Sequence, residues 1–253
     1  VTLEKFCGGR KKMSNNLLKA SGVVAVGTIV SRITGLFRSL IIVAVLGSAL
    51  LGDTYNVANQ MPNIIYNLII GGSLTAVFIP QIVRSIANPS EGKKYLSSLL
   101  TSTTLVMGFL TVLSIFAAPI LVRIFATSFV GHPEFEITVL FMRICLPQIF
   151  FLTIYALLGQ IANAQGYFGS MAWAPVINNL ILIVGFVFFK KSNFLTVANI
   201  SHHTIVWLGA ITTLGYLGQV VIMTPIIWKS STPIRFSIQL RNSELLKSFR
   251  LAL

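Results

Sequence analysis

The chain has 253 residues, of which 55% are hydrophobic and only 10% are charged. A water-soluble domain of this length carries about 25% charged residues, so the composition excludes a soluble globular protein and predicts an integral membrane protein. The formal net charge is +13, and most of the Lys and Arg residues lie outside the apolar runs, as in cytoplasmic loops that meet anionic headgroups. No aromatic-basic pattern accompanies this charge, so we expect no nucleic-acid partner.

The first 21 residues form a basic tail, which is not a signal peptide because no apolar core precedes a cleavage site. The chain opens on Val1, whereas Met13 begins a natural-looking terminus, so residues 1–12 are interpreted as an extension from an upstream start site. Residues 22–253 are then expected to form one transmembrane bundle.

Six apolar runs are long enough to cross a membrane, given that ~20 residues span its hydrocarbon core. They cover residues 22–46, 54–83, 97–122, 137–162, 172–189 and 204–228. A seventh helix is expected to begin near Asn242. The predicted fold class is therefore an all-α, polytopic membrane bundle.

Several spans are interrupted by helix-breaking residues, namely Pro62, Gly71, Gly72, Pro147 and Pro175. Broken helices at membrane depth are tolerated where they are buried in protein or line a water-filled cavity. The interruptions therefore favour a transport protein over a simple anchor.

Loop charge predicts the orientation of the bundle. Thirteen Lys and Arg residues fall on the side of the N-terminus, and three, Arg123, Lys190 and Lys191, fall on the other side. The positive-inside rule then makes the N-terminus cytoplasmic. The two adjacent lysines are the exception, and they would snorkel at a helix end.

The first span contains two arginines, Arg32 and Arg38, and no other charge. A guanidinium at membrane depth costs at least ~2.5–3.5 kcal/mol, and intramembrane charge is functional by default. Such groups offer paired donors to phosphate or pyrophosphate, and a salt bridge within the bundle is the alternative. The two lie ~120° apart around an ideal helix, and Gly35 between them could permit a bend that brings them together.

The second span carries a stripe of polar residues with spacings of 3, 4, 3 and 4. The stripe consists of Asp53, Asn56, Gln60, Asn63 and Asn67. At ~100° per residue these side chains share a narrow arc of one helix face, with Asn59 beside it. They would line a cavity for water or sugar groups, or else join helices by hydrogen bonds, and Asp53 could instead be a helix N-cap.

The candidate substrate-binding residues are Arg32, Arg38, Asp53, Asn56, Gln60, Asn63 and Asn67. No His, Cys and carboxylate cluster suggests a metal. No Ser, His and Asp set and no phosphate-cradling glycine loop suggests catalysis, so we expect a transporter without a cofactor.

Three stretches resemble the MurJ/MviN family of lipid II flippases, which belongs to the multidrug/oligosaccharidyl-lipid/polysaccharide exporter superfamily. They are SRITGLFRSLIIVAVLG (31–47), GDTYNVANQMPNIIYNLIIGGSLTAVFIP (52–80) and QIANAQGYFGSMAWAPVINN (160–179). The resemblance implies a bacterial inner-membrane protein that moves the undecaprenyl-pyrophosphate-linked peptidoglycan precursor, lipid II, to the outer leaflet by alternating access. It also implies that Arg32 and Arg38 are cavity arginines and that Asp53 is the family's functional aspartate.

The sequence departs from the enterobacterial form of the family. It has Tyr66 and Asn67 where that form has two arginines, and Gly71 where that form has a Glu. Only the first of the family's two bundles is expected here, so the isolated chain would be an N-terminal half. A separate second-half chain, a homodimer or a broken gene would explain this, and other cell wall proteins and membrane lipid are further candidate partners.

Two other functions stay open. One is another exporter of the same superfamily, carrying drugs or a different polysaccharide-linked lipid. The other is a non-transporting scaffold of the cell wall machinery, in which the polar stripe would only join helices.

Overall fold

The computed structural model of the chain describes residues 2–47, 50–71, 79–87, 89–191 and 201–228. These residues form helices and connecting turns, with no strand among them. The α-helices are α1 (Thr2–Leu46), α2 (Leu50–Tyr66), α3 (Ile79–Ala87), α4 (Pro89–Phe116), α5 (Ala118–Phe125), α6 (Glu134–Cys145), α7 (Gln148–Ala164), α8 (Gly169–Lys191) and α9 (His202–Trp228). A π-helical segment, Asn67–Gly71, follows α2, and a 3-10 turn, Thr127–Phe129, follows α5.

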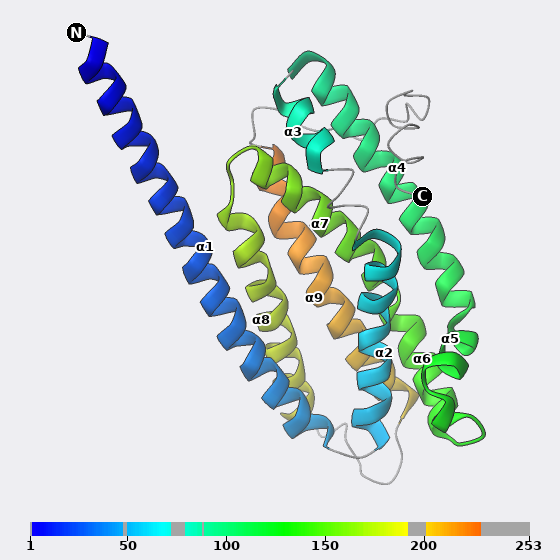
Figure 1. Ribbon diagram of the computed structural model, residues 1–253. Coiled ribbons are helices and arrows are strands. Elements are labelled where there is room, and N and C mark those ends of the chain that lie inside the picture. The colour runs from blue at the N-terminus through cyan, green and yellow to red at the C-terminus, as the bar shows by residue number, and fades with distance from the viewer. Residues whose placement is uncertain (1, 48–49, 72–78, 88, 192–200, 229–253) are drawn as a thin grey trace.

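The long helices run up and down through one bundle (Figure 1). Five stretches of the described residues are long and apolar enough to cross a membrane. They are Ala20–Leu46, Gly92–Phe116, Glu134–Ala164, Gly169–Lys191 and His202–Ile226. The predicted all-α membrane bundle is thus confirmed.

The second predicted span, residues 54–83, is not one continuous helix among the described residues. Helix α2 ends at Tyr66 and widens into the π-helical segment, and α3 begins only at Ile79. Residues 72–78, with Gly72, and the seventh helix expected near Asn242 lie outside the described residues. The expected basic tail continues the first span, since the α1 backbone is helical from Thr2.

Prolines break some helices and leave others intact. Pro147 separates α6 from α7, because it has no N–H to donate to the carbonyl one turn earlier. Pro62 and Pro175 instead lie inside α2 and α8. The fourth predicted span is therefore a broken helix, as expected, whereas the second and fifth tolerate their prolines.

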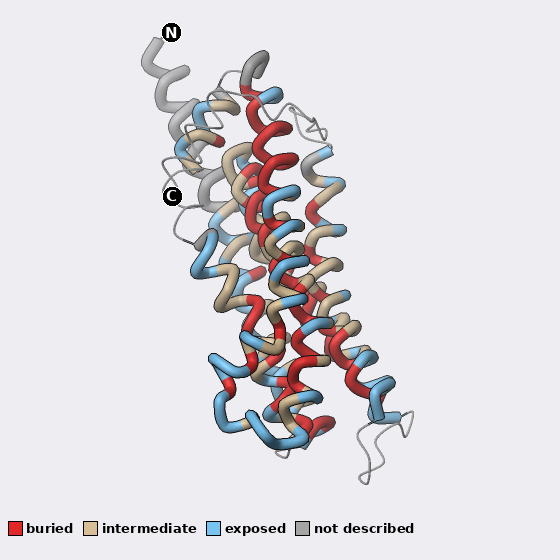
Figure 2. Tube along the Cα trace, turned by 90° about the vertical axis from the view of Figure 1, so that its right-hand side faces the viewer, coloured by how far each residue is buried: buried red, intermediate tan, exposed pale blue. Residues whose placement is uncertain are grey.

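The core is centred on Tyr55, which is 3% exposed. Its ring makes edge-to-face contacts with Phe141 of α6 and Phe186 of α8, at centroid distances of 5.8 and 5.7 Å. Its hydroxyl lies 3.0 Å from the Thr212 hydroxyl of α9. Edge-to-face aromatic pairs stabilise a protein by more than the burial of their surface alone. Tyr55 therefore joins α2 to three other helices. Figure 2 shows the buried positions gathered inside the bundle.

Helix α1 lies at the edge of the bundle and packs along α8, touching α2 at few positions (Figure 1). Only 11% of its apolar stretch is buried. Its close approach to α8 depends on Gly27, because a Cβ there would lie 2.9 Å from two ring atoms of Trp173. Apart from its few contacts with α2, the helix is therefore held mainly by α8.

We expect Gly27→Val to destabilise the packing of α1 on α8 by about 1–3 kcal/mol, the usual cost of overfilling a packed contact. The matched control is Gly22→Val in the same helix, since a Cβ at Gly22 meets nothing within 4 Å. The measurement is the thermal unfolding midpoint of the purified protein in detergent. Equal midpoints for the two variants would contradict the described packing.

Candidate functional site

A tight connection brings the end of α1 next to the start of α2. Gly47 adopts a φ of +74°, which favours glycine, and its N–H donates to the Val43 carbonyl at 2.9 Å. A Cβ on Gly52 would overlap the Gly47 carbonyl oxygen. These two glycines let the polar faces of the two helices meet.

A cavity of about 710 Å³ lies between α1 and α2. Its wall consists of Arg38, Ser39, Ile42, Val43, Leu46, Gly47, Gly52, Asp53, Tyr55, Asn56, Asn59, Gln60, Asn63, Ile64 and Tyr216. The wall thus comes from the second half of α1, the face of α2 that carries the amide stripe, and one residue of α9.

Arg38 is the cationic member of this wall. It lies eight residues before the end of α1, about 12 Å along the helix axis at 1.5 Å per residue. Its Nε is buried and has no hydrogen-bond partner. Among the residues that the structure describes, Arg38 forms no salt bridge, so the salt-bridge alternative finds no partner there.

The amides of α2 are partly satisfied by each other and by α9. Gln60 donates to the Asn56 side-chain oxygen at 2.7 Å, and Asn63 donates to the Tyr216 hydroxyl at 3.3 Å. The Asn59 side-chain oxygen is buried without a partner. Two residues of the wall, Arg38 and Asn59, thus each have a buried polar atom without a partner.

Two of the predicted site residues do not line the cavity. Arg32 is exposed, because α1 runs unbroken through Gly35 and keeps the two arginines ~120° apart. The bend that Gly35 could permit would be needed to bring the two together. Asn67 is exposed in the π-helical segment, beyond the cavity.

Asp53 lines the cavity near its end and is exposed. Helix α2 begins at Leu50, so Asp53 lies in its first turn and not at the N-cap. A carboxylate in the first turn is favoured by the helix dipole, and the side chain stays accessible to the cavity.

Tyr216 and Ser39 are wall residues that the sequence analysis did not single out. Tyr216 lies 153 positions from Asn63 in the chain, and nothing in the spacing of an apolar helix signals such a contact. Ser39 was detectable only as the neighbour of Arg38.

The arrangement can bind an anion. A guanidinium with an unpaired N–H, next to amide groups in a site of low polarity, gives short charge-assisted hydrogen bonds to phosphate oxygens. Within the described part of the chain, no group of three or more His, Cys, Asp or Glu residues could hold a metal ion.

A family model described as lipid II flippase MurJ matches residues 42–253. Proteins described as probable lipid II flippase MurJ are similar to this chain. The one from Rickettsia prowazekii is 31% identical over 174 residues, covering 66% of this chain and 34% of the relative. The one from Bdellovibrio bacteriovorus is 33% identical over 181 residues, covering 70% and 34%. The chain thus spans about a third of the length of these relatives.

A solved structure, titled lipid II flippase MurJ in an inward closed conformation, superposes with a TM-score of 0.68. The match covers 90% of this chain and 46% of that chain, at 22% sequence identity. At this identity the likeness shows a shared fold.

If the stripe lines a watery cavity, cysteines introduced there should react with a membrane-impermeant maleimide. In a protein that carries Cys7→Ser, we expect labelling of Asn56→Cys and Gln60→Cys, which are exposed cavity positions. Ala58→Cys on the buried face of the same helix, at 0% exposure, should stay unlabelled. Equal protection of all three positions would instead favour the helix-joining interpretation.

Proposed function

This chain belongs to the family of the lipid II flippase MurJ, and from that premise we propose that it binds the pyrophosphate of a lipid-linked peptidoglycan precursor during flipping. The relatives' descriptions name lipid II, a pyrophosphate-linked lipid. The single observation that carries the proposal is Arg38, a permanent cation that lines the 710 Å³ cavity beside the amides of α2 and forms no salt bridge among the described residues.

Each residue of the cavity wall has a proposed role that follows from the chemistry of its side chain. Arg38 would bind the pyrophosphate oxygens, since its fork of donors matches them. Asn56, Gln60 and Asn63 would exchange hydrogen bonds with sugar groups or water. Asp53 would repel the anion at the cavity's end or pair with an arginine as the cavity closes. Arg32 and Asn67 take no part in this proposal, because they lie outside the cavity.

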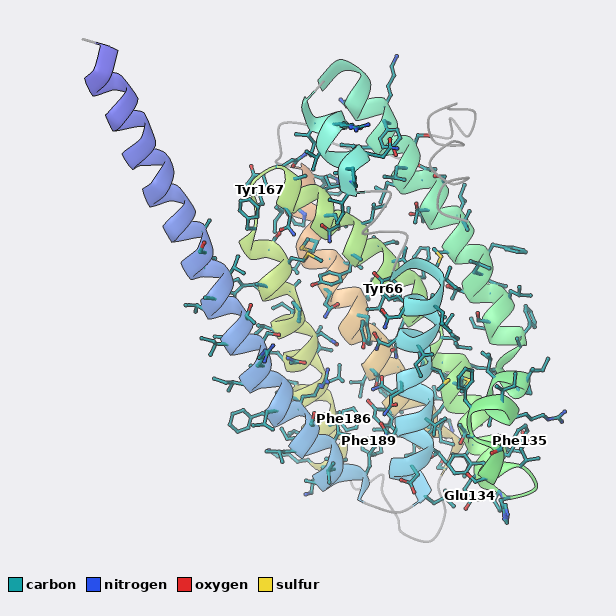
Figure 3. The ribbon with its side chains drawn as sticks, in the orientation of Figure 1. Tyr66, Glu134, Phe135, Tyr167, Phe186 and Phe189 are labelled. Carbon is teal, nitrogen blue, oxygen red and sulfur yellow. The ribbon has the colours of Figure 1, made fainter. Side chains whose placement is uncertain are left out.

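We also propose that the protein lies in the bacterial inner membrane with its N-terminus in the cytoplasm. Helix α3 and the start of α4 lie at the end of the bundle where α1 begins (Figure 1), and they carry exposed Arg84, Lys93 and Lys94. The opposite end mixes Arg123, Lys190 and Lys191 with acidic residues, and Figure 3 places Glu134 there, away from Tyr167. This asymmetry supports a cytoplasmic N-terminus by the positive-inside rule.

Transport would follow alternating access, in which helical units rock around a site near mid-membrane. The chain spans about a third of the length of its curated relatives, so the complete cycle is proposed for the family's whole protein. For this chain the proposal is anion binding at Arg38. The function is that of a transporter and not of an enzyme.

One observation favours the scaffold alternative. The bonds of Gln60 to Asn56 and of Asn63 to Tyr216 satisfy amides within the protein, as helix-joining residues do. A scaffold, however, gives no reason for an unpaired arginine in the same wall. The effect of removing that arginine therefore separates the two functions.

We expect Arg38→Ala to weaken binding of undecaprenyl pyrophosphate to the protein in nanodiscs by about 10- to 100-fold, the loss of ~1.5–3 kcal/mol for hydrogen bonds to a charged group. The affinity of Arg38→Lys should lie between those of the parent and of Arg38→Ala, because an ammonium lacks the guanidinium's paired donors. The measurement is a binding titration, with survival of flippase-depleted cells as a second readout.

The matched control is Arg143→Ala, which removes an exposed arginine of α6 that lies outside the cavity. It should bind as the parent does. Unchanged binding in Arg38→Ala would argue against the flippase proposal and for a scaffold.

A further inference from the structure

Helix α1 is tied to the bundle at mid-membrane by the side chain of Asn179 on α8. Its Nδ2 donates to the Ser31 carbonyl and to the Thr34 hydroxyl, both at 3.0 Å. Asn179 is 4% exposed, so these bonds form in a dry contact. The Thr34 hydroxyl in turn donates to the Val30 carbonyl at 2.8 Å, which leaves it free to accept.

The other ties between α1 and α8 differ in kind. Lys190 donates to the Ala44 carbonyl at 3.4 Å near the end of both helices. Gly27 and Trp173 instead make a close van der Waals contact, which depends on the absence of a side chain at Gly27. Among the described residues, the two hydrogen bonds of Asn179 are thus the polar contact between α8 and the stretch of α1 that carries Arg38.

Asn179 contacts the helix face that carries Arg38. At ~100° per residue, Ser31, Thr34 and Arg38 fall within ~60° of one another, whereas Arg32 lies ~100° away from Ser31. A Cβ at Gly35, on this same face, would lie 3.5 Å from the Asn179 Nδ2. A rotation of α1 by one residue would break both bonds and turn Arg38 away from the α2 wall.

We propose that Asn179 is a positioning residue, which fixes the rotation of α1 and thereby keeps Arg38 in the cavity. The proposal rests on the proposed function only in that Arg38 binds the anion. The adjacent Asn178 is buried but faces α9, where it contacts Gly215. Asn178 thus contacts α9 and Asn179 contacts α1. Of the two asparagines, Asn179 is therefore the one that positions Arg38.

The first test measures the accessibility of position 38 without any ligand. The protein carries Arg38→Cys and Cys7→Ser, while Cys145 is fully buried, and it reacts with a membrane-impermeant maleimide in nanodiscs. We expect Asn179→Ala to slow labelling by ~3- to 10-fold and Thr34→Val by ~3-fold, the range that one or two interhelical hydrogen bonds supply. Asn178→Ala is the matched control and should label at the parent rate.

Thr34→Val keeps the side-chain shape and removes one hydrogen-bond acceptor. If Asn179→Ala does not reach the membrane, the labelling rate of Thr34→Val therefore tests the proposal instead. Labelling at the parent rate in both variants would overturn the proposal. So would equal slowing in Asn178→Ala, because the effect would then be general loosening of α8.

The second test is a double-mutant cycle on binding of farnesyl pyrophosphate. Asn179→Ala should weaken binding by ~3- to 10-fold when Arg38 is present and have no further effect in Arg38→Ala, since the two residues act as a unit. Additive losses would overturn the positioning role. If Arg38→Ala alone leaves binding unchanged, the proposed function fails, and the labelling test still judges Asn179 by itself.

Discussion

An arginine at membrane depth cannot give up its charge, and this constraint organises the region around Arg38. The guanidinium stays protonated in proteins, and a lipid environment offers it no partner. The structure places it against a wall of amides on α2, with the cavity between them. Gly47 after α1 and Gly52 in the first turn of α2 make this juxtaposition possible, because they bring the helices close where their polar faces begin.

Elsewhere in the bundle, some buried polar groups are paired across helices. Where Pro147 breaks the fourth span, the freed Ile144 carbonyl accepts from the Thr213 hydroxyl at 2.8 Å. The Gln148 amide donates to that same hydroxyl at 3.4 Å. A broken helix at membrane depth needs such substitutes for its lost backbone bonds. The chain therefore satisfies polar groups around this break. Arg38 and Asn59 differ from the other residues that have a buried side-chain atom without a partner, because these two line the cavity.

The fold and one wall of the cavity could be predicted from sequence because both follow from local periodicity. Apolar length predicts spans, and the spacing of Asn56, Gln60 and Asn63 places them on one face. Asn67 escapes this rule because the helix widens to π geometry there, and the ~100° step holds only in an α-helix. Tyr216 could not be found at all, since its contact with Asn63 depends on how α9 packs. The pairing of Arg32 with Arg38 needed a bend at Gly35, whereas α1 continues as one helix through that residue.

The two walls of the cavity are anchored to different parts of the bundle. Helix α2 is tied to α6, α8 and α9 through the buried ring and hydroxyl of Tyr55. Helix α1 is tied to α8, with 11% of its apolar stretch buried. Displacing α2 would disrupt a packed aromatic core, whereas rotating α1 would break the hydrogen bonds of Asn179 and Lys190 and the close contacts at its glycines. The position of Arg38 therefore depends on how α1 packs on α8, whereas the position of the amide wall depends on the aromatic core.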